Sequence, residues 1–325
     1  MILYIKGRKT DRLREFIQFL IEEQELNLPL TFSLRYMKTI LFFPLILCSL
    51  IVFPQNSIVD SLQKVLQTQK EDTNKVHVLN ALGRALMLNE DRNKSIEYSK
   101  HALALSAKLN FKPGLGMAFH NLGYAYMGMN KFPEAVENYM NAIKVQEACA
   151  DKRRLATTYN NIGMLYISQK DYTNALRFYF KALKILDELG DMTRRHNPYN
   201  NIAGIYTEMG NYTEALKYYS LTLKIRKQVG DKSLIADSYC ALGNVYHKLN
   251  NQTEALNKYD TALKICEEVG NKPLMAVVFG GLGEVHATLK NYEKARYYLD
   301  RGLVFFRITR DAGWRFAKSL AIDTG

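Results

Sequence analysis

Apolar and small residues recur at helical spacing along most of the chain, in stretches divided by short polar breaks. Residues 151–190 hold two such stretches, one on each side of a break at residues 169–171. The first follows the i, i+3, i+4, i+7 spacing of one helix face, through Leu155, Tyr159, Ile162, Gly163 and Tyr166. The second runs through Ala175, Leu176, Tyr179, Ala182, Leu183 and Leu186. The pattern predicts two antiparallel helices joined by a turn.

This helix pair recurs every 40 residues. One column of small residues holds Gly83, Gly123, Gly163, Ala203, Gly243 and Gly283. A second column, twelve positions later, holds Ser95, Ala135, Ala175, Ala215, Ala255 and Ala295. A fixed period of this length, held over six copies, is typical of stacked repeat proteins. We therefore expect an all-α solenoid of about six helix pairs over residues 75–310, preceded by a capping helix at 57–74 and followed by a partial helix at 311–325.

Turn residues mark the expected helix ends. Gly190, Gly230 and Gly270 close successive units and suit the left-handed conformation found after a helix C-terminus. Near the start of the second helix, Thr173 is expected to cap the free backbone amides, and Thr213 and Thr253 repeat it. The glycine at 163 and the alanines after it are expected to leave room where the two helices of a unit cross.

The repeating residues resemble the tetratricopeptide repeat. The third unit supplies the family pattern as Tyr159, Ile162, Gly163, Tyr166, Ala175, Tyr179 and Ala182. The 40-residue length resembles the subclass of kinesin light chains and Leu-Gly-Asn repeat proteins. The resemblance implies a right-handed superhelical solenoid whose first helices line a concave groove, and it implies a protein or an extended peptide as the ligand.

Asparagines recur at the expected groove positions. Asn121, Asn161 and Asn201 stand two residues before the small residue of their repeats, and Asn160 and Asn200 stand one residue earlier. Tyr124 and Asn244 occupy the position after the glycine. A side-chain amide offers both a donor and an acceptor, so a row of amides can pair with a peptide backbone. These seven residues are the candidate peptide-binding site; the alternative is that the asparagines are ordinary polar residues of a solvated groove or cap neighbouring turns.

The remaining chemistry favours a binding protein that is not an enzyme and needs no cofactor. Four cysteines and six histidines show no metal-ligand spacing, and Gly280–Gly283 lack the Lys-Ser/Thr of a phosphate-binding loop. The net charge of +12 is attributed mainly to a solvated, lysine-rich surface. Basic residues alternate with acidic ones along the second helices, which argues against nucleic-acid binding.

The first part of the chain has the features of an export signal. Residues 39–53 contain no charge, follow Lys38, and precede a polar stretch, as in a secretory signal peptide. We interpret 37–56 as this signal and Met37 as the natural start, with 1–36 as a non-native or disordered extension. The competing interpretation is an uncleaved membrane anchor. Either interpretation predicts a location in a bacterial cell envelope, in the periplasm or attached to the membrane, and membrane contact only through this segment.

These patterns favour a scaffold or adaptor that binds a partner protein along its groove. The alternative is the sensory portion of a membrane signal-transduction protein, with a histidine kinase or a DNA-binding region as its output. A third possibility, a cytoplasmic scaffold, requires residues 39–53 to be core, although they fall outside the repeat register.

Overall fold

The computed structural model describes residues 57–88 and 91–308. Its contacts divide the chain into Met1–Ser57 and Ile58–Gly325, and only the second unit is described below. The expected extension at 1–36, the signal at 37–56 and the partial helix at 311–325 lie outside the described residues. Among the described helices, none is long and apolar enough to cross a membrane.

The described residues form helices and no strands, which confirms the all-α fold class. A single helix, α3 (Ser57–Thr68), precedes the repeats. The first helices of the six repeats are α4 (Thr73–Leu88), α6 (Lys112–Gly128), α8 (Lys152–Ser168), α10 (His196–Glu208), α12 (Lys232–Lys248) and α14 (Lys272–Thr288). The second helices are α5 (Arg92–Lys108), α7 (Phe132–Ala148), α9 (Tyr172–Glu188), α11 (Tyr212–Val229), α13 (Gln252–Val269) and α15 (Tyr292–Ile308). A short 3₁₀ helix, η2 (Thr193–Arg195), leads into α10.

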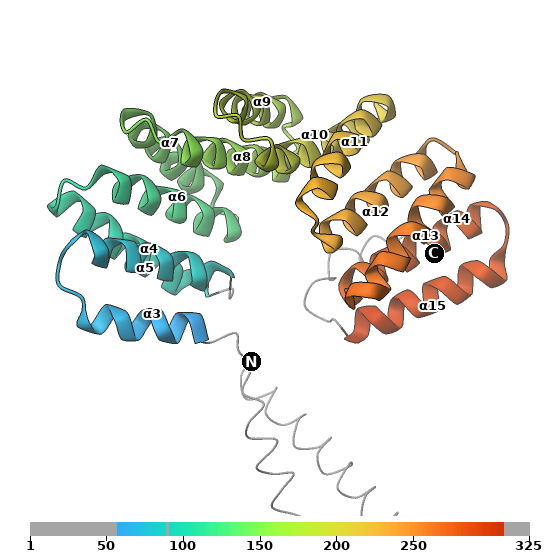
Figure 1. Ribbon diagram of the computed structural model, residues 1–325, viewed down its shortest axis with the longest axis horizontal. Helices are drawn as coiled ribbons and strands as arrows, with labels where there is room; N and C mark the ends of the chain where they lie inside the picture. Colours follow the sequence, from blue (N-terminus) through green and yellow to red (C-terminus); the bar gives the residue numbers. More distant parts are fainter. Residues whose placement is uncertain (1–56, 89–90, 309–325) are drawn as a thin grey trace, which may run out of the picture. The chain divides into compact units, whose positions relative to one another are not determined.

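Consecutive helices pack as pairs, and each pair packs on the next (Figure 1). The closest packing is in most cases within a repeat, followed by that between a second helix and the next first helix; α5 packs on α6 as closely as helices of one repeat do. First helices also contact one another, α4 with α6, α6 with α8, α8 with α10, and α12 with α14. Within the described part of the chain, successive second helices make no comparable contact. One face of the stack is therefore made by first helices in contact with one another. The exception is α10 and α12, which make little or no contact with each other.

The core is a continuous seam between repeats, because each cluster draws on several helices. One cluster joins residues of α7, α8 and α9, and in it the rings of Tyr166 and Phe178 stack with centroids 5.5 Å apart. Tyr139, Tyr179 and Tyr259, at equivalent positions of three second helices, are fully buried. These large side chains fill the spaces that the small residues of the first helices leave open.

The helix C-termini are as predicted, and the predicted N-caps are wrong. Gly190, Gly230 and Gly270 have φ of +64°, +83° and +68°, a region open to glycine without steric cost. The N-caps of α9, α11 and α13 are Asp171, Asn211 and Asn251, two residues before the threonines expected in that role. The Oδ1 atom of each accepts from the backbone amide three residues later. These second helices therefore begin two residues earlier than the threonines suggest.

Candidate functional site

A hollow of about 810 Å³ lies on the first-helix face of repeats 1–4. Its walls come mainly from α4, α6 and α8, with residues of α9, η2 and the start of α10, and we call it the first-helix groove. Of the seven predicted site residues, four line it: Asn121, Tyr124, Asn160 and Asn161. The other three, Asn200, Asn201 and Asn244, are not among its lining residues.

The asparagines connect neighbouring first helices in a regular way. The Nδ2 atom of Asn121 donates to the backbone oxygen and to Oδ1 of Asn80, at 3.0 and 3.1 Å. The Nδ2 atom of Asn161 lies 3.3 Å from Nε2 of His120, and that of Asn201 donates to Oδ1 of Asn160 at 3.5 Å. Each pair joins residues 41 positions apart. We call these three pairs the inter-repeat ladder; they give the asparagines a structural role in addition to any role in binding.

The ladder ends after the fourth repeat. Asn200 stands where Asn80, His120 and Asn160 stand in their repeats, but the partner position 41 residues later is Ala241. The Oδ1 atom of Asn200 is accordingly buried without a hydrogen-bond partner. Asn244 lies at a different helical position, is exposed, and accepts from the hydroxyl of Tyr259.

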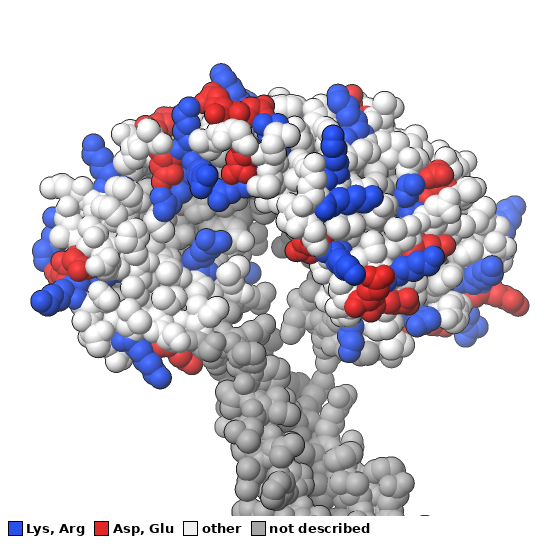
Figure 2. Space-filling model, viewed as in Figure 1, with Lys and Arg blue, Asp and Glu red and all other residues white. Residues whose placement is uncertain are grey.

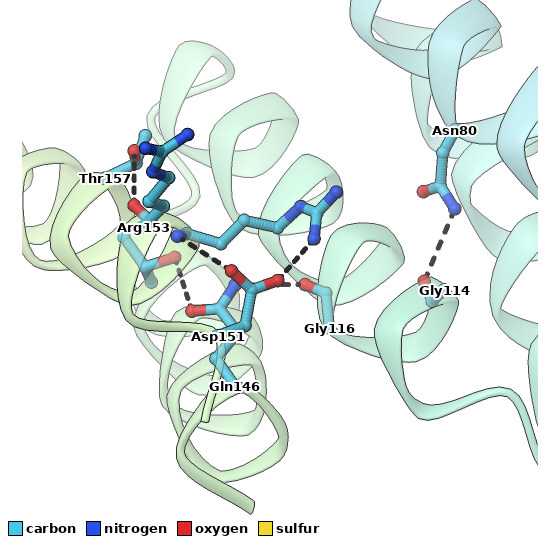
Figure 3. Close-up of polar contacts among 9 residues, drawn as sticks. Asn80, Gly114, Gly116, Gln146, Asp151, Arg153 and Thr157 are labelled. Carbon is cyan, nitrogen blue, oxygen red and sulfur yellow. Dashed lines mark hydrogen bonds and ion pairs between the residues drawn. The ribbon is translucent and has the colours of Figure 1, made fainter. Parts of the chain in front are cut away.

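A chain of hydrogen bonds continues from the ladder into the core. The Nδ1 atom of His120 lies 2.9 Å from Oγ1 of Thr158, which donates to Oε1 of Gln146 at 2.9 Å. Gln146 in turn donates to the backbone oxygen of Gly116 (Figure 3). Because the Thr158 proton points to Gln146, Nδ1 of His120 must donate and Nε2 must accept from Asn161. The imidazole is therefore neutral in this arrangement.

The electrostatic surroundings of His120 agree with that protonation state. Burial, together with the charges of Arg84 and Arg154, lowers the pKa of His120 to about 4. Arg84 belongs to the repeat before His120 and Arg154 to the repeat after it, so two guanidinium groups approach the groove wall from opposite sides.

Arginines are the main feature that the sequence reading of the site did not include. Arg84, Arg153, Arg154 and Arg194 all line the groove, and the only carboxylate among its lining residues is Asp151. Asp151 caps α8, accepting from the backbone amide of Arg154 at 3.2 Å, and it forms an ion pair with the Arg154 side chain (Figure 3). The 40-residue period could reveal only one recurrence, that of Arg154 at Arg194.

Large side chains from the second helices lie beneath the amides. Burial and the nearby Tyr124 raise the pKa of Tyr139 well above its ordinary value. The hydroxyls of Tyr139 and Tyr179 are buried, and the ladder residues Asn161 and Asn201 lie next to them.

The described residues outside the groove contain no cluster of metal ligands, and their buried cysteines are not reactive thiols. Over 57–88 and 91–308, no group of three His, Cys, Asp or Glu side chains could hold a metal ion. Cys240 and Cys266 are free and buried. Burial raises the pKa of both thiols, that of Cys266 to about 11, so these cysteines behave as small apolar core residues.

The comparisons with known proteins agree with this architecture. The tetratricopeptide repeat family matches residues 115–188, 194–268 and 253–306, which together make up more than half of the chain. The chain therefore belongs to the tetratricopeptide repeat family, whose fold is that of a protein-interaction scaffold. No curated protein matches the chain significantly.

Three solved structures illustrate the fold. The chain is similar to a signal-transduction ATPase with a tetratricopeptide repeat sensor from Pyrococcus horikoshii (17% identity, TM-score 0.64, 80% of this chain and 40% of that one). It is also similar to kinesin light chain-type repeats from Podospora anserina (17%, 0.51, 62% and 99%). A third similar structure is the apo form of the quorum sensor NprR from B. thuringiensis (17%, 0.53, 93% and 95%). At these identities the likeness concerns the fold alone.

Proposed function

We propose that this protein is a non-enzymatic scaffold that binds an extended segment of a partner protein in the first-helix groove. The observation that carries the proposal is the groove itself, in which exposed and half-buried amides, an aromatic ring and guanidinium groups face one hollow across four repeats. An extended strand leaves its backbone donors and acceptors free, and side-chain amides can satisfy both kinds.

The ladder geometry leaves part of each amide available to a ligand. Among the described residues, the hydrogen bonds of Asn121 use only its Nδ2 atom, which leaves its Oδ1 atom able to accept from a ligand. Asn160 makes only long contacts: its Nδ2 donates to Asn161 at 3.5 Å and to the sulfur of Met164 at 3.8 Å, and its Oδ1 accepts from Asn201 at 3.5 Å. Contacts of that length are weak, so a peptide backbone can replace them at little cost.

An unbiased peptide library tests the proposal. The protein comprising residues 57–325 would be used to select binders from a library of random twelve-residue peptides. The affinity of the selected peptides for this protein and for a Tyr124→Ala/Asn160→Ala variant would then be compared by fluorescence anisotropy. We expect them to lose about tenfold or more in affinity, in line with the loss of an aromatic contact and a hydrogen bond. A matched variant, Asn138→Ala/Asn257→Ala, removes one half-buried and one exposed amide of the second helices, outside the groove, and should leave binding unchanged. Equal binding to all three proteins would contradict the proposal.

We further propose that the scaffold works in a bacterial cell envelope. Support comes from the charge-free stretch at 39–53 and the basic residue before it. The test is a fusion of residues 37–56 to a reporter that is active only after export. Reporter activity equal to that of a fusion carrying Leu45→Arg and Ile46→Arg would contradict it.

A sensory role is the second candidate. It is favoured by two of the structural relatives, which are described as a repeat sensor and a quorum sensor. The two candidates share the groove and differ in what binding causes. Co-purification of a kinase or DNA-binding activity that changes when a selected peptide is added would favour the sensor over the adaptor.

A further inference from the structure

The first helices of repeats 1–3 carry no acidic residue. The sequences of α4, α6 and α8 contain only basic charges, namely Lys75, Arg84, Lys112, Lys152, Arg153 and Arg154. The second helices of the same repeats carry the acids, Glu97, Glu134, Glu137, Glu147, Asp187 and Glu188. The second helices also carry basic residues, so charge of both signs is mixed there, whereas the charge on these three first helices is basic only.

Inside the groove, the guanidinium groups are only partly neutralised. Arg154 pairs with Asp151, and Arg194 with Asp191 at 3.4 Å. Neither Arg84 nor Arg153 forms an ion pair with any described residue. Figure 2 shows a basic group in the hollow beside α6 without acidic side chains next to it, whereas both signs of charge are mixed over α8 and α9. Arginines that line a groove and lack a carboxylate are well suited to bidentate pairing with an anionic ligand.

From the purely basic charge of these first helices, and from the two groove arginines without an ion pair, we infer that the groove of repeats 1–4 selects a partner segment rich in Asp and Glu. Its side-chain carboxylates pair with Arg84 and Arg153 while its backbone lies along the amides. The inference rests on the proposed function and names its ligand class. Neighbouring helix axes lie about 8–10 Å apart, so Arg84 and Arg153, two helices apart, are roughly 16–20 Å from each other. An extended chain covers that distance in about five or six residues, which sets the spacing expected between acidic positions.

The geometry distinguishes this ligand from a captured C-terminus. A terminal carboxylate needs one compact cationic pocket, whereas the arginines here come from repeats 1, 3 and 4. Distributed charges of this kind match a segment that carries several carboxylates along its length. They also raise the rate of association with an acidic partner, an effect that salt screens.

The test compares peptides that differ only in charge. Three fluorescein-labelled peptides of about ten residues with amidated C-termini alternate Ala with Glu, Gln or Lys, and their anisotropy is measured at about 0.05 M and 0.5 M salt. We expect the Glu peptide to bind at least about tenfold more tightly than the Gln peptide at low salt, with most of that difference lost at high salt. An Arg84→Gln/Arg153→Gln variant should lose the preference. The control, Lys144→Gln/Arg177→Gln, removes equal charge from the exposed faces of α7 and α9 and should retain it.

Charge reversal provides a readout that loss of folding cannot imitate. An Arg84→Glu/Arg153→Glu variant with an unchanged circular-dichroism melt should bind the Lys peptide and reject the Glu peptide. Equal affinity for Glu and Gln peptides, or no binding of either, would overturn the inference. If the Gln peptide binds and the Tyr124→Ala/Asn160→Ala variant loses it, the proposed function stands and only the acidic preference fails. Arginine-dependent binding of a single-stranded oligonucleotide that displaces the Glu peptide would also overturn it, in favour of nucleic acid.

Discussion

Gly163 of α8 lies directly against the ring of Tyr179 in α9. A Cβ atom added at Gly163 would stand 2.7 Å from Cε1 and Cζ of that ring, well inside van der Waals contact. Tyr179 is fully buried and cannot move aside without opening the core. The same relationship joins Gly123 to Tyr139 and Gly243 to Tyr259, so the helix crossing of three repeats depends on a missing methyl group.

This contact predicts a large penalty for any side chain at 163. Gly163→Ala should destabilise the protein by about 1–3 kcal/mol through overpacking, and Gly163→Leu by more. The control is Gly204→Ala in α10, where the added Cβ would meet only the Tyr219 hydroxyl at 3.7 Å. That change should stabilise by up to about 1 kcal/mol, because alanine is the better helix former. Urea denaturation followed by circular dichroism measures both, and equal stability of the two variants would contradict the prediction.

The fourth repeat shows what an alanine in this column does. Ala203 replaces the glycine, and its partner Tyr219 is half-buried, whereas Tyr139, Tyr179 and Tyr259 have no exposed surface. Burial still raises the pKa of Tyr219, to about 12. The sequence predicted this column of small residues correctly. It could not predict that the tyrosine sixteen positions after this alanine would be more exposed than the tyrosines that face a glycine.

The inter-repeat ladder predicts different costs for two asparagines at equivalent positions. Asn80 is buried and donates to the backbone oxygens of Val76 and Gly114 at 3.2 and 3.3 Å (Figure 3). Asn80→Ala removes hydrogen-bond partners of Gly114 and Asn121, and it should lower the free energy of unfolding by about 1–3 kcal/mol. Asn200→Ala removes an oxygen that has no partner and should change stability by less than about 0.5 kcal/mol. Thermal melts of the two variants would contradict the ladder if Asn200→Ala proved the more costly change.

The N-caps found in the structure make a similar matched pair. The Oδ1 atom of Asn251 accepts from the backbone amide of Glu254 at 3.2 Å, while Thr253, the residue that the sequence suggested, makes no capping bond. Asn251→Ala should therefore cost about 1 kcal/mol, and Thr253→Ala should cost much less. A chemical denaturation series that ranks the two variants the other way would restore the original assignment.

Much of the fold could be predicted from this sequence because the 40-residue period fixes the positions of equivalent residues. Six copies of one spacing place the helices, the crossings and the face that holds Asn121 and Asn161. The hydrogen-bond partners could not be predicted, because they depend on the offset between neighbouring helices; the structure sets that offset at 41 residues. The arginines were missing from the predicted site for another reason. Arg84 and Arg153 each occur in one repeat only, and only the folded groove brings them together.

A buried arginine at the junction of repeats 4 and 5 leads to a further prediction. Arg226 is buried, and its Nη1 atom contacts Oδ2 of Asp237 at 2.6 Å, with the Leu234 oxygen and Ser238 Oγ at 2.9 Å. Arg226→Met replaces the ion pair by apolar volume and should be close to neutral or mildly stabilising. Asp237→Ala leaves the buried charge without its partner and should cost about 3 kcal/mol. A double-mutant cycle checks this; a larger loss in Arg226→Met than in Asp237→Ala would contradict it.

The neutral imidazole of His120 makes stability depend on pH in a defined window. The pKa of His120 is lowered to about 4 in the folded protein, whereas an unfolded histidine titrates near 6.5. Between these values the unfolded chain binds the additional proton, so the free energy of unfolding rises with pH. The contribution is complete above about pH 6.5 and is lost as the pH falls towards 4. Since the ring is only partly buried, we expect a loss of about 2–3 kcal/mol.

His120→Asn isolates this effect. The asparagine has no titrating group, and its Oδ1 can accept from Asn161, as Asn80 and Asn160 accept at the equivalent positions. Its shorter side chain loses the packing of the imidazole ring and the Nδ1 bond to Thr158. We expect the variant to be less stable than the original at pH 7.5, and the difference to shrink as the pH approaches 4. Carboxylates and His286, whose pKa burial also lowers, are common to both proteins and cancel in that difference. A stability difference that stays constant between pH 7.5 and 4 would show that His120 takes up its proton without breaking the bond to Asn161.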